Sequence, residues 1–131
     1  MTDQQLFQCA CEALKMAYTP YSHFNVGACI LATDGRTFQG CNVENASYGA
    51  TICAERTAVV TAVTQGAQAF SAIAVVGEDA PAWPCGVCRQ VLNEFSADMR
   101  VICGAAKTGE YQVVKLSELL PHSFGPHDLQ Q

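Results

Sequence analysis

Two short, almost wholly apolar segments constrain the fold of this chain most strongly. They are SAIAVVGED, at residues 71–79, and MRVICGA, at residues 99–105. Segments of this length and composition are typical of β-strands that are buried on both faces, in sheets covered by helices on each side. The sequence therefore predicts a sheet between two layers of helices.

The other elements are predicted around these strands. Apolar residues recur at helical spacing over residues 3–18, before Pro20, and DG in TDGR predicts a hairpin with strands at 24–32 and 37–43. Further helices are expected in CAERTAVVTAVTQG, PCGVCRQVLNEF and LSELLP, and a more exposed strand in EYQVVKL. We expect an α/β fold, a three-layer α/β/α sandwich with a mixed sheet of about five strands. Residues 1–131 are expected to form a single domain.

Composition excludes several classes of partner. The formal net charge is −5 and the Lys and Arg residues form no cluster, which disfavours binding to long nucleic acids. No segment approaches the roughly 18 consecutive apolar residues that span a bilayer, so no membrane partner is expected. The start of the sequence lacks the basic and apolar regions of a secretory signal, and we expect a cytoplasmic protein. Its eight cysteines are then expected to be reduced thiols or metal ligands.

Cysteines in two predicted helix starts form a candidate zinc site. Cys85 and Cys88 lie in PCGVC, and Cys53 lies at the start of CAERTAVV. Three thiolates leave one position of a tetrahedral zinc ion for water, which is the arrangement of catalytic rather than structural zinc. Glu55 lies two residues after Cys53, where its carboxylate can take a proton from that water and return it to a substrate.

A cation beside the thiolates would strengthen such a site, because three thiolates give it a net charge of about −1. Arg56 lies three residues after Cys53 on the same helical face. We expect Arg56 to donate N–H groups to the sulfurs and to withdraw charge from them. Arg89 is a weaker candidate for the same role.

Two other functions are alternatives to a catalytic zinc site. One is a non-enzymatic structural zinc module, in which Cys41 or Cys103 completes a four-thiolate site. The other is a thioredoxin-like oxidoreductase that uses Cys85 and Cys88, which leaves the pairing of Cys53 with Glu55 unexplained. Otherwise the remaining cysteines are expected to be small buried hydrophobic residues, namely Cys9, Cys11, Cys29, Cys41 and Cys103.

CAE followed by PCGVC also matches the signature of zinc nucleobase deaminases. The chain resembles the short, single-domain cytidine deaminases along nearly its whole length, through YTPYSHFNVGA, GCNVENASYG, TICAERTA, PCGVCRQV and ELLPHSFGPHDL. The resemblance implies hydrolytic deamination of cytidine and 2′-deoxycytidine to uridine and 2′-deoxyuridine, with release of ammonia, in pyrimidine salvage. It implies one zinc ion per subunit held by Cys53, Cys85 and Cys88, with Glu55 as proton shuttle. Deamination of another free base or nucleoside is the alternative within the family.

The resemblance also implies residues that contact the substrate. Phe24 would stack on the base, although as a strand residue alone it would be expected in the core. Asn42 and Glu44 would bind the sugar hydroxyls, and Ala54 would offer main-chain contacts to the pyrimidine. A carboxylate at Glu44 suits a neutral nucleoside and disfavours a 5′-phosphate.

The same resemblance implies a homotetramer. Phe124 would close the pocket of a neighbouring subunit, and Tyr48 is expected to serve similarly. Trp83 departs from the family pattern, because small residues are more usual before PCG. We expect Trp83 to cover its loop rather than to line the mouth of the pocket.

Overall fold

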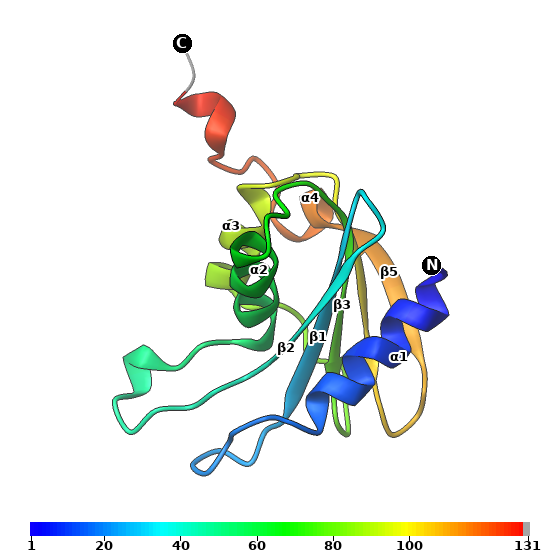
Figure 1. Cartoon of the computed structure of the whole chain (residues 1–131). Coiled ribbons are helices and arrows are strands. Elements are labelled where there is room, and N and C mark those ends of the chain that lie inside the picture. Colours follow the sequence, from blue (N-terminus) through cyan, green and yellow to red (C-terminus); the bar gives the residue numbers. More distant parts are fainter. Residues whose placement is uncertain (130–131) are drawn as a thin grey trace.

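The sheet is mixed and has five strands in the order β2-β1-β3-β4-β5, in a computed structural model that describes residues 1–129 (Figure 1). β1 pairs antiparallel with β2 and with β3, β3 runs parallel to β4, and β4 pairs antiparallel with β5. The strands are β1 (Val26–Ala32), β2 (Thr37–Cys41), β3 (Phe70–Gly77), β4 (Arg100–Ala105) and β5 (Tyr111–Lys115).

Helices cover both faces of this sheet, which confirms the predicted three-layer α/β/α arrangement (Figure 1). One face carries α1 (Asp3–Leu14), and the other carries α2 (Ala54–Thr64), α3 (Gly86–Asn93) and α4 (Leu116–Leu119). Two short 3₁₀ helices, η1 (Tyr48–Ala50) and η2 (Pro126–Asp128), complete the elements. None of the helices in the described part of the chain has both the length and the apolar character to cross a bilayer.

The central strands bury side chains on both faces, as their apolar composition predicts. In β3, Ile73 and Val75 pack in the cluster under α2, whereas Ala74 and Val76 pack in the cluster under α1. Successive side chains of a strand point to opposite faces, so a strand between two helical layers needs apolar residues at every position. β5 lies at the edge of the sheet and is largely exposed, as expected.

Three predicted boundaries are wrong, and contacts between distant segments account for two of them. The first helix ends at Leu14 rather than at residue 18, since the backbone of Tyr18 pairs with the chain after β2. The Tyr18 N–H donates to the carbonyl of Asn42, and the Tyr18 carbonyl accepts from Glu44 N–H, both at 2.9 Å. The second boundary is the end of β2, which lies at Cys41 rather than at residue 43. The chain after Cys41 continues in isolated bridges.

The third difference concerns the start of β1, which begins at Val26 rather than at residue 24. His23 has a φ of 59°, in the left-handed region that residues with a Cβ atom seldom adopt. This turn interrupts the extended run and leaves Phe24 in a loop. Phe24 is 56% exposed, so it does not take the core position that a strand phenylalanine alone would suggest.

The strand directions bring two helix N-termini to the same end of the sheet. Because β1 is antiparallel to both β2 and β3, the carboxyl ends of these two strands lie on the same side. α2 follows β2 in the chain and α3 follows β3, so both helices begin there. Crevices outside the carboxyl ends of strands are the usual ligand sites of open α/β sheets.

Gly40 lets α2 lie directly on β2. A Cβ atom at Gly40 would lie 2.4 Å from the carbonyl oxygen of Ala54 and 2.4 Å from the backbone nitrogen of Ala58. Only a residue without a side chain fits at this contact, which sets how near the first turn of α2 comes to the sheet.

Candidate active site

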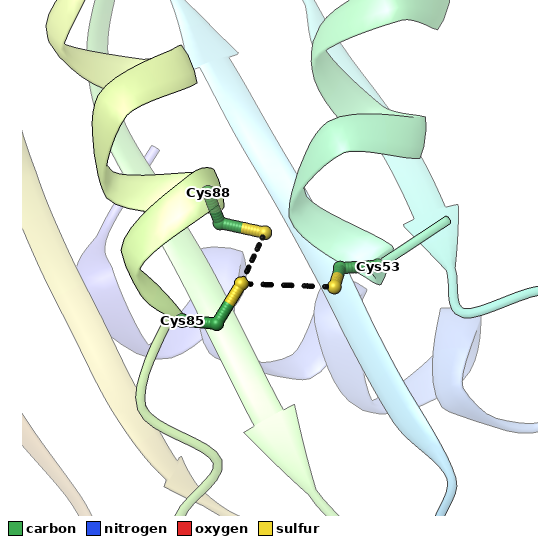
Figure 2. A group of neighbouring side chains, drawn as sticks. All are labelled: Cys53, Cys85 and Cys88. Atoms are coloured by element: carbon green, nitrogen blue, oxygen red, sulfur yellow. Dashed lines mark hydrogen bonds between the residues drawn. The ribbon is translucent and has the colours of Figure 1, made fainter. Parts of the chain in front are cut away.

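Three cysteine sulfurs meet where α2 and α3 begin (Figure 2). Cys53 is the N-cap residue of α2, Cys85 is the N-cap residue of α3, and Cys88 lies in the first turn of α3. The Sγ atoms of Cys53 and Cys85 are 3.9 Å apart, and those of Cys85 and Cys88 are 3.5 Å apart. All three atoms lie within 4.8 Å of one another.

This spacing fits one metal ion. A tetrahedral zinc ion with bonds of about 2.3 Å holds its sulfur ligands about 3.8 Å apart. Thiolate sulfur is also a ligand type that zinc prefers in proteins. Among residues 1–129, these cysteines form the only group of three or more His, Cys, Asp or Glu side chains close enough to bind a metal together.

Hydrogen bonds favour a thiolate at Cys53. The Cys88 thiol and Arg56 lower the pKa of Cys53 to about 5, against the opposing effect of burial. The pKa of Cys88 is raised, because its proton is shared with the Cys53 sulfur and because Cys88 is buried. The site therefore carries negative charge on sulfur, which favours a cation.

Glu55 lies beside the sulfurs and is 4% exposed. Burial, with a smaller contribution from the charge of Cys53, raises the pKa of this carboxyl group to about 7, against the lowering effect of the backbone N–H of Glu55. A carboxyl group with a pKa near neutrality can both accept and donate a proton at physiological pH.

Arg56 lies against one of the three sulfurs, and its expected role of withdrawing charge from them stays a prediction. Its Nη2 atom lies 3.6 Å from the Sγ atom of Cys53 and 3.3 Å from the carbonyl oxygen of Thr51. The Nε atom of Arg56 is buried and has no hydrogen-bond partner within the described residues. The guanidinium group is thus held against the thiolates, and a sulfur ligand accepts one of its N–H groups.

A cavity of about 380 Å³ opens beside Glu55. It is lined by Phe24, Val26, Asn42, Thr51, Cys53, Ala54, Glu55, Pro81, Ala82, Trp83 and Cys85. Aromatic rings, a carboxyl group and candidate metal ligands therefore face one space. A larger cavity of about 580 Å³ shares Pro81 with it, but none of the grouped cysteines lines that second space, so we place the chemistry in the smaller one.

The comparison with known families gives the identity of this arrangement. A sequence model described as "Cytidine and deoxycytidylate deaminase zinc-binding region" matches residues 1–105. The chain belongs to the cytidine and deoxycytidylate deaminase family. The cofactor of this protein is zinc, with one ion per chain. The cysteine group at the starts of α2 and α3 fits this ion.

Individual members of the family are similar over nearly the whole chain. A cytidine deaminase of Halalkalibacterium halodurans is 47% identical over 131 residues, which cover 98% of this chain and 98% of that protein. A cytidine deaminase of Mycobacterium tuberculosis is 44% identical over 122 residues, or 92% of this chain and 87% of that one. The solved structure of a cytidine deaminase from Burkholderia pseudomallei matches with a TM-score of 0.90 and 46% identity, covering 95% of this chain and all (100%) of the other.

The structure gives no support to a structural zinc site in which Cys41 or Cys103 is a fourth ligand. The Cys41 thiol points to the carbonyl oxygen of Met16, 3.4 Å away. Cys103 lines the larger cavity, and burial raises its pKa to about 12. Neither residue joins the group of three sulfurs.

The other cysteines are less uniform than expected. All eight cysteines are free, as predicted, and Cys29 and Cys103 are buried. Cys9, Cys11 and Cys41 are only partly buried, because they lie at the margins of the packed layers. The description of all five as buried residues is therefore wrong for these three.

The two residues expected to read the sugar lie in different hydrogen-bond networks. Asn42 lines the cavity, where its Nδ2 donates to the carbonyl of Phe24 at 2.7 Å and its Oδ1 accepts from Val26 N–H at 3.0 Å. Glu44 lines an adjoining hollow of about 380 Å³, which shares Thr51 with the cavity. The Ser22 hydroxyl holds the pKa of the Glu44 carboxyl below its ordinary value, with further help from backbone N–H groups.

Like Glu44, two further expected substrate contacts do not line the cavity of their own chain. Tyr48 is exposed in η1, lines the adjoining hollow, and packs edge-to-face against Tyr21 with ring centroids 6.0 Å apart. Phe124 is exposed beyond α4, where its carbonyl accepts hydrogen bonds from Gln90 and Asn93. Within one chain, these two residues stand apart from the sulfurs.

The site residues predicted from the sequence leave out five residues of the cavity wall, namely Val26, Thr51, Pro81, Ala82 and Trp83. Trp83 lines the cavity and is 38% exposed, so the expectation that it only covers its loop is wrong. An unusual aromatic residue two positions before a metal-binding cysteine was the available signal. Thr51, which lines both spaces, gives no such signal because threonine is common in loops.

Proposed function

We propose that this protein is a cytidine deaminase, a hydrolase that converts cytidine and 2′-deoxycytidine to uridine and 2′-deoxyuridine with release of ammonia. The observation that carries the proposal is a buried carboxyl group, Glu55, beside a three-thiolate group at one cavity. The cytidine deaminases to which the chain is similar support the choice of substrate. The reaction would belong to pyrimidine salvage.

Cys53, Cys85 and Cys88 would hold the zinc ion through their Sγ atoms. When bound, zinc supplies a Lewis acid that lowers the pKa of a water molecule at the position left by three protein ligands. The cysteines also fix where the reaction takes place, because the carbon that is attacked must lie at the inner end of the cavity beside their sulfurs.

Glu55 would move the protons. Its carboxylate would accept a proton from the attacking water, deliver it to the ring nitrogen next to C4, and then help to protonate the departing amine. This work needs a group that is stable in both protonation states near neutrality, and the pKa of Glu55 is raised to about 7 by burial. Burial in the cavity wall also keeps competing water from the carboxylate.

Arg56 would withdraw charge from the sulfurs. An N–H···S contact such as the one to Cys53, at 3.6 Å, leaves less electron density for the metal. The Arg56 contact would therefore leave the three sulfurs as weaker electron donors to a metal ion than unassisted thiolates would be.

Four residues would bind the nucleoside. Phe24 would stack on the base, and the main chain at Ala54 would contact the pyrimidine edge. Asn42 and Glu44 would bind the sugar hydroxyls, since each keeps free hydrogen-bonding capacity beyond its bonds to the loop before β1. The negative charge of Glu44 would disfavour nucleotides and nucleic acid strands.

We further propose a homotetramer in which Tyr48 and Phe124 help to close pockets of neighbouring subunits. Large apolar side chains are exposed on α2 and α3, at Val60, Val63 and Val87, and a helix surface of this kind suits burial between subunits. A cytoplasmic location and the folding of residues 1–131 as a single domain are part of the same proposal.

Incubation of the zinc-loaded protein with cytidine tests the function. We expect the ultraviolet spectrum to change to that of uridine, with ammonia released in equal amount. Deoxycytidine should be converted in the same way, and a panel of cytosine and adenosine would identify another base or nucleoside as the substrate. No change in any spectrum, with zinc bound, would refute the proposal.

Light scattering tests the assembly separately. We expect the mass of four chains, and a monomeric mass with full activity would refute the homotetramer without affecting the proposed reaction.

A further inference from the structure

Glu44 holds the loop that carries Phe24. Its Oε1 atom accepts hydrogen bonds from the backbone N–H groups of Tyr21, at 3.0 Å, and Ser22, at 3.1 Å. The Ser22 hydroxyl donates to the other carboxylate oxygen. A carboxylate 22 residues further along the chain therefore fixes the middle of this loop.

Ser22 passes this constraint on to Phe24. Its Oγ atom, which donates to Glu44, also accepts the backbone N–H of Phe24 at 3.0 Å. A hydroxyl group has one donor and two acceptor sites, so both bonds form at once. The bonds form a continuous chain from the Glu44 carboxylate to the backbone of Phe24.

The backbone between these two bonds needs such support. His23 lies between Ser22 and Phe24 with a φ of 59°, and its N–H donates to the carbonyl of Thr19 at 3.0 Å. A residue with a Cβ atom stays in the left-handed region only where its surroundings hold it there. The Ser22 hydroxyl spans His23 directly.

These hydrogen bonds also link residues of the hollow that Glu44 lines to a residue of the cavity that Glu55 lines. Ser22 and Glu44 line the hollow that contains Tyr48, whereas Phe24 lines the cavity with Glu55. The serine hydroxyl thus connects the Glu44 side chain, which lines the hollow, to the backbone of Phe24, which lines the cavity.

We propose that Ser22 is a positioning residue for substrate binding, whose hydroxyl couples the placement of Glu44 to the placement of Phe24. This inference rests on the proposed function, in which Glu44 binds the sugar and Phe24 stacks on the base. Through Ser22, the two halves of a nucleoside are bound by one hydrogen-bonded unit rather than by two independent groups.

The first test is Ser22→Ala, with Ser22→Thr as the conservative variant that keeps the hydroxyl. We expect Ser22→Ala to raise the KM for cytidine about tenfold, because a hydrogen bond to a charged group is lost, with kcat changed less than about twofold. The Kd for uridine, measured by calorimetry, should rise by the same factor. Ser22→Thr should restore both constants, and Ser96→Ala, in the loop after α3, should leave them at their wild-type values.

A double-mutant cycle separates positioning from general stabilisation. If Ser22 acts through Phe24, then Ser22→Ala adds little to the Kd for uridine once Phe24→Ala is present. Effects that multiply independently, or a change in melting temperature without any change in KM or Kd, would overturn the inference.

The outcomes for the two proposals are distinct. Failure of the wild-type protein to deaminate cytidine refutes the proposed function. A wild-type enzyme that works and an equally effective Ser22→Ala variant refute only the coupling.

Discussion

Gly40 on β2 lies so close to the first turn of α2 that a Cβ atom there would come within 2.4 Å of the Ala54 carbonyl oxygen. Ala54 stands between Cys53 and Glu55, so this contact sets the distance of both residues from the sheet. Gly40, in the central sheet, therefore controls the geometry of the site.

Gly40→Ala should disturb the protein and its metal site together. Overpacking of a tight backbone contact costs about 1–3 kcal/mol, so we expect a lower free energy of unfolding in urea. Displacement of the first turn of α2 should also weaken zinc binding, which competition with a chelator measures. Gly49→Ala is the matched control, since a Cβ atom at Gly49 meets nothing within 4 Å. Equal stability and zinc affinity in the two variants would refute this account.

Glu55→Gln should keep its zinc and lose its turnover. Glutamine has nearly the same shape as glutamate but cannot carry the proton, and positioned proton transfer typically contributes about 10²–10⁴-fold to the rate. We expect a loss of at least about 100-fold in kcat, with zinc content unchanged by elemental analysis. Glu12→Gln, an exposed change on α1, should remain as active as the wild type. A variant that loses zinc along with activity would instead indicate that Glu55 supports the metal.

Arg56→Gln should weaken the site without abolishing it. Removal of the N–H groups that face Cys53 leaves the thiolate charge uncompensated, and such changes around metal ligands cost about 10–100-fold in affinity or activity. Chelator competition and the rate of cytidine turnover measure the two effects. Arg36→Gln provides a control, because Arg36 pairs with Asp34 on the surface. Unchanged zinc affinity and turnover would remove Arg56 from the site.

Trp83→Ala should change substrate binding more than chemistry. The indole lines the cavity beside Cys85, and aromatic contacts contribute about 0.5–1.5 kcal/mol beyond area burial. We therefore expect the KM for cytidine to rise about threefold to tenfold with little change in kcat. Val113→Ala, on the exposed strand β5, should not have this effect. A fall in melting temperature alone, with KM unchanged, would show that Trp83 supports its loop and the cavity wall without contributing to substrate binding.

The Glu44 carboxylate predicts a dependence of stability on pH. Its pKa is lowered from 4.5 by the Ser22 hydroxyl and the N–H groups of Ser22 and Tyr21. A group whose folded pKa is lowered stabilises the folded state above its unfolded pKa, and this contribution is lost as the pH falls through the folded pKa. The wild type should thus be more stable than Glu44→Gln at pH 7, and the difference should shrink as the pH falls below 4.5. Urea unfolding of both proteins across this range measures it, and a constant difference would contradict the assignment.

Local patterns predicted most of the layers and the sulfur group. The apolar runs at β3 and β4, the turn at Gly35 and the helix starts at Cys53 and Cys85 all depend on neighbours within a few residues. The fold class was predicted correctly for this reason. The roles of the individual site residues stay predictions until variants are measured.

Contacts between distant segments account for what the sequence did not predict. The end of α1 depends on pairing between Tyr18 and the chain after β2, and the loop at Ser22 depends on Glu44. Neither pairing has a periodic pattern, because each involves single residues in irregular segments. Exposure of Trp83 to the cavity likewise depends on how the loop after β3 closes over the sheet edge.

Within the sulfur group, Cys53 and Cys85 are 32 positions apart in the chain, with all of β3 between them. An ion bound to all three sulfurs is therefore a cross-link, comparable to a disulfide that closes a loop of this length. It limits the freedom of the unfolded chain as well as organising the folded one. In this protein, the ion needed for turnover would also keep the starts of α2 and α3 together, so that removal of the metal would loosen the architecture as well as stop the reaction.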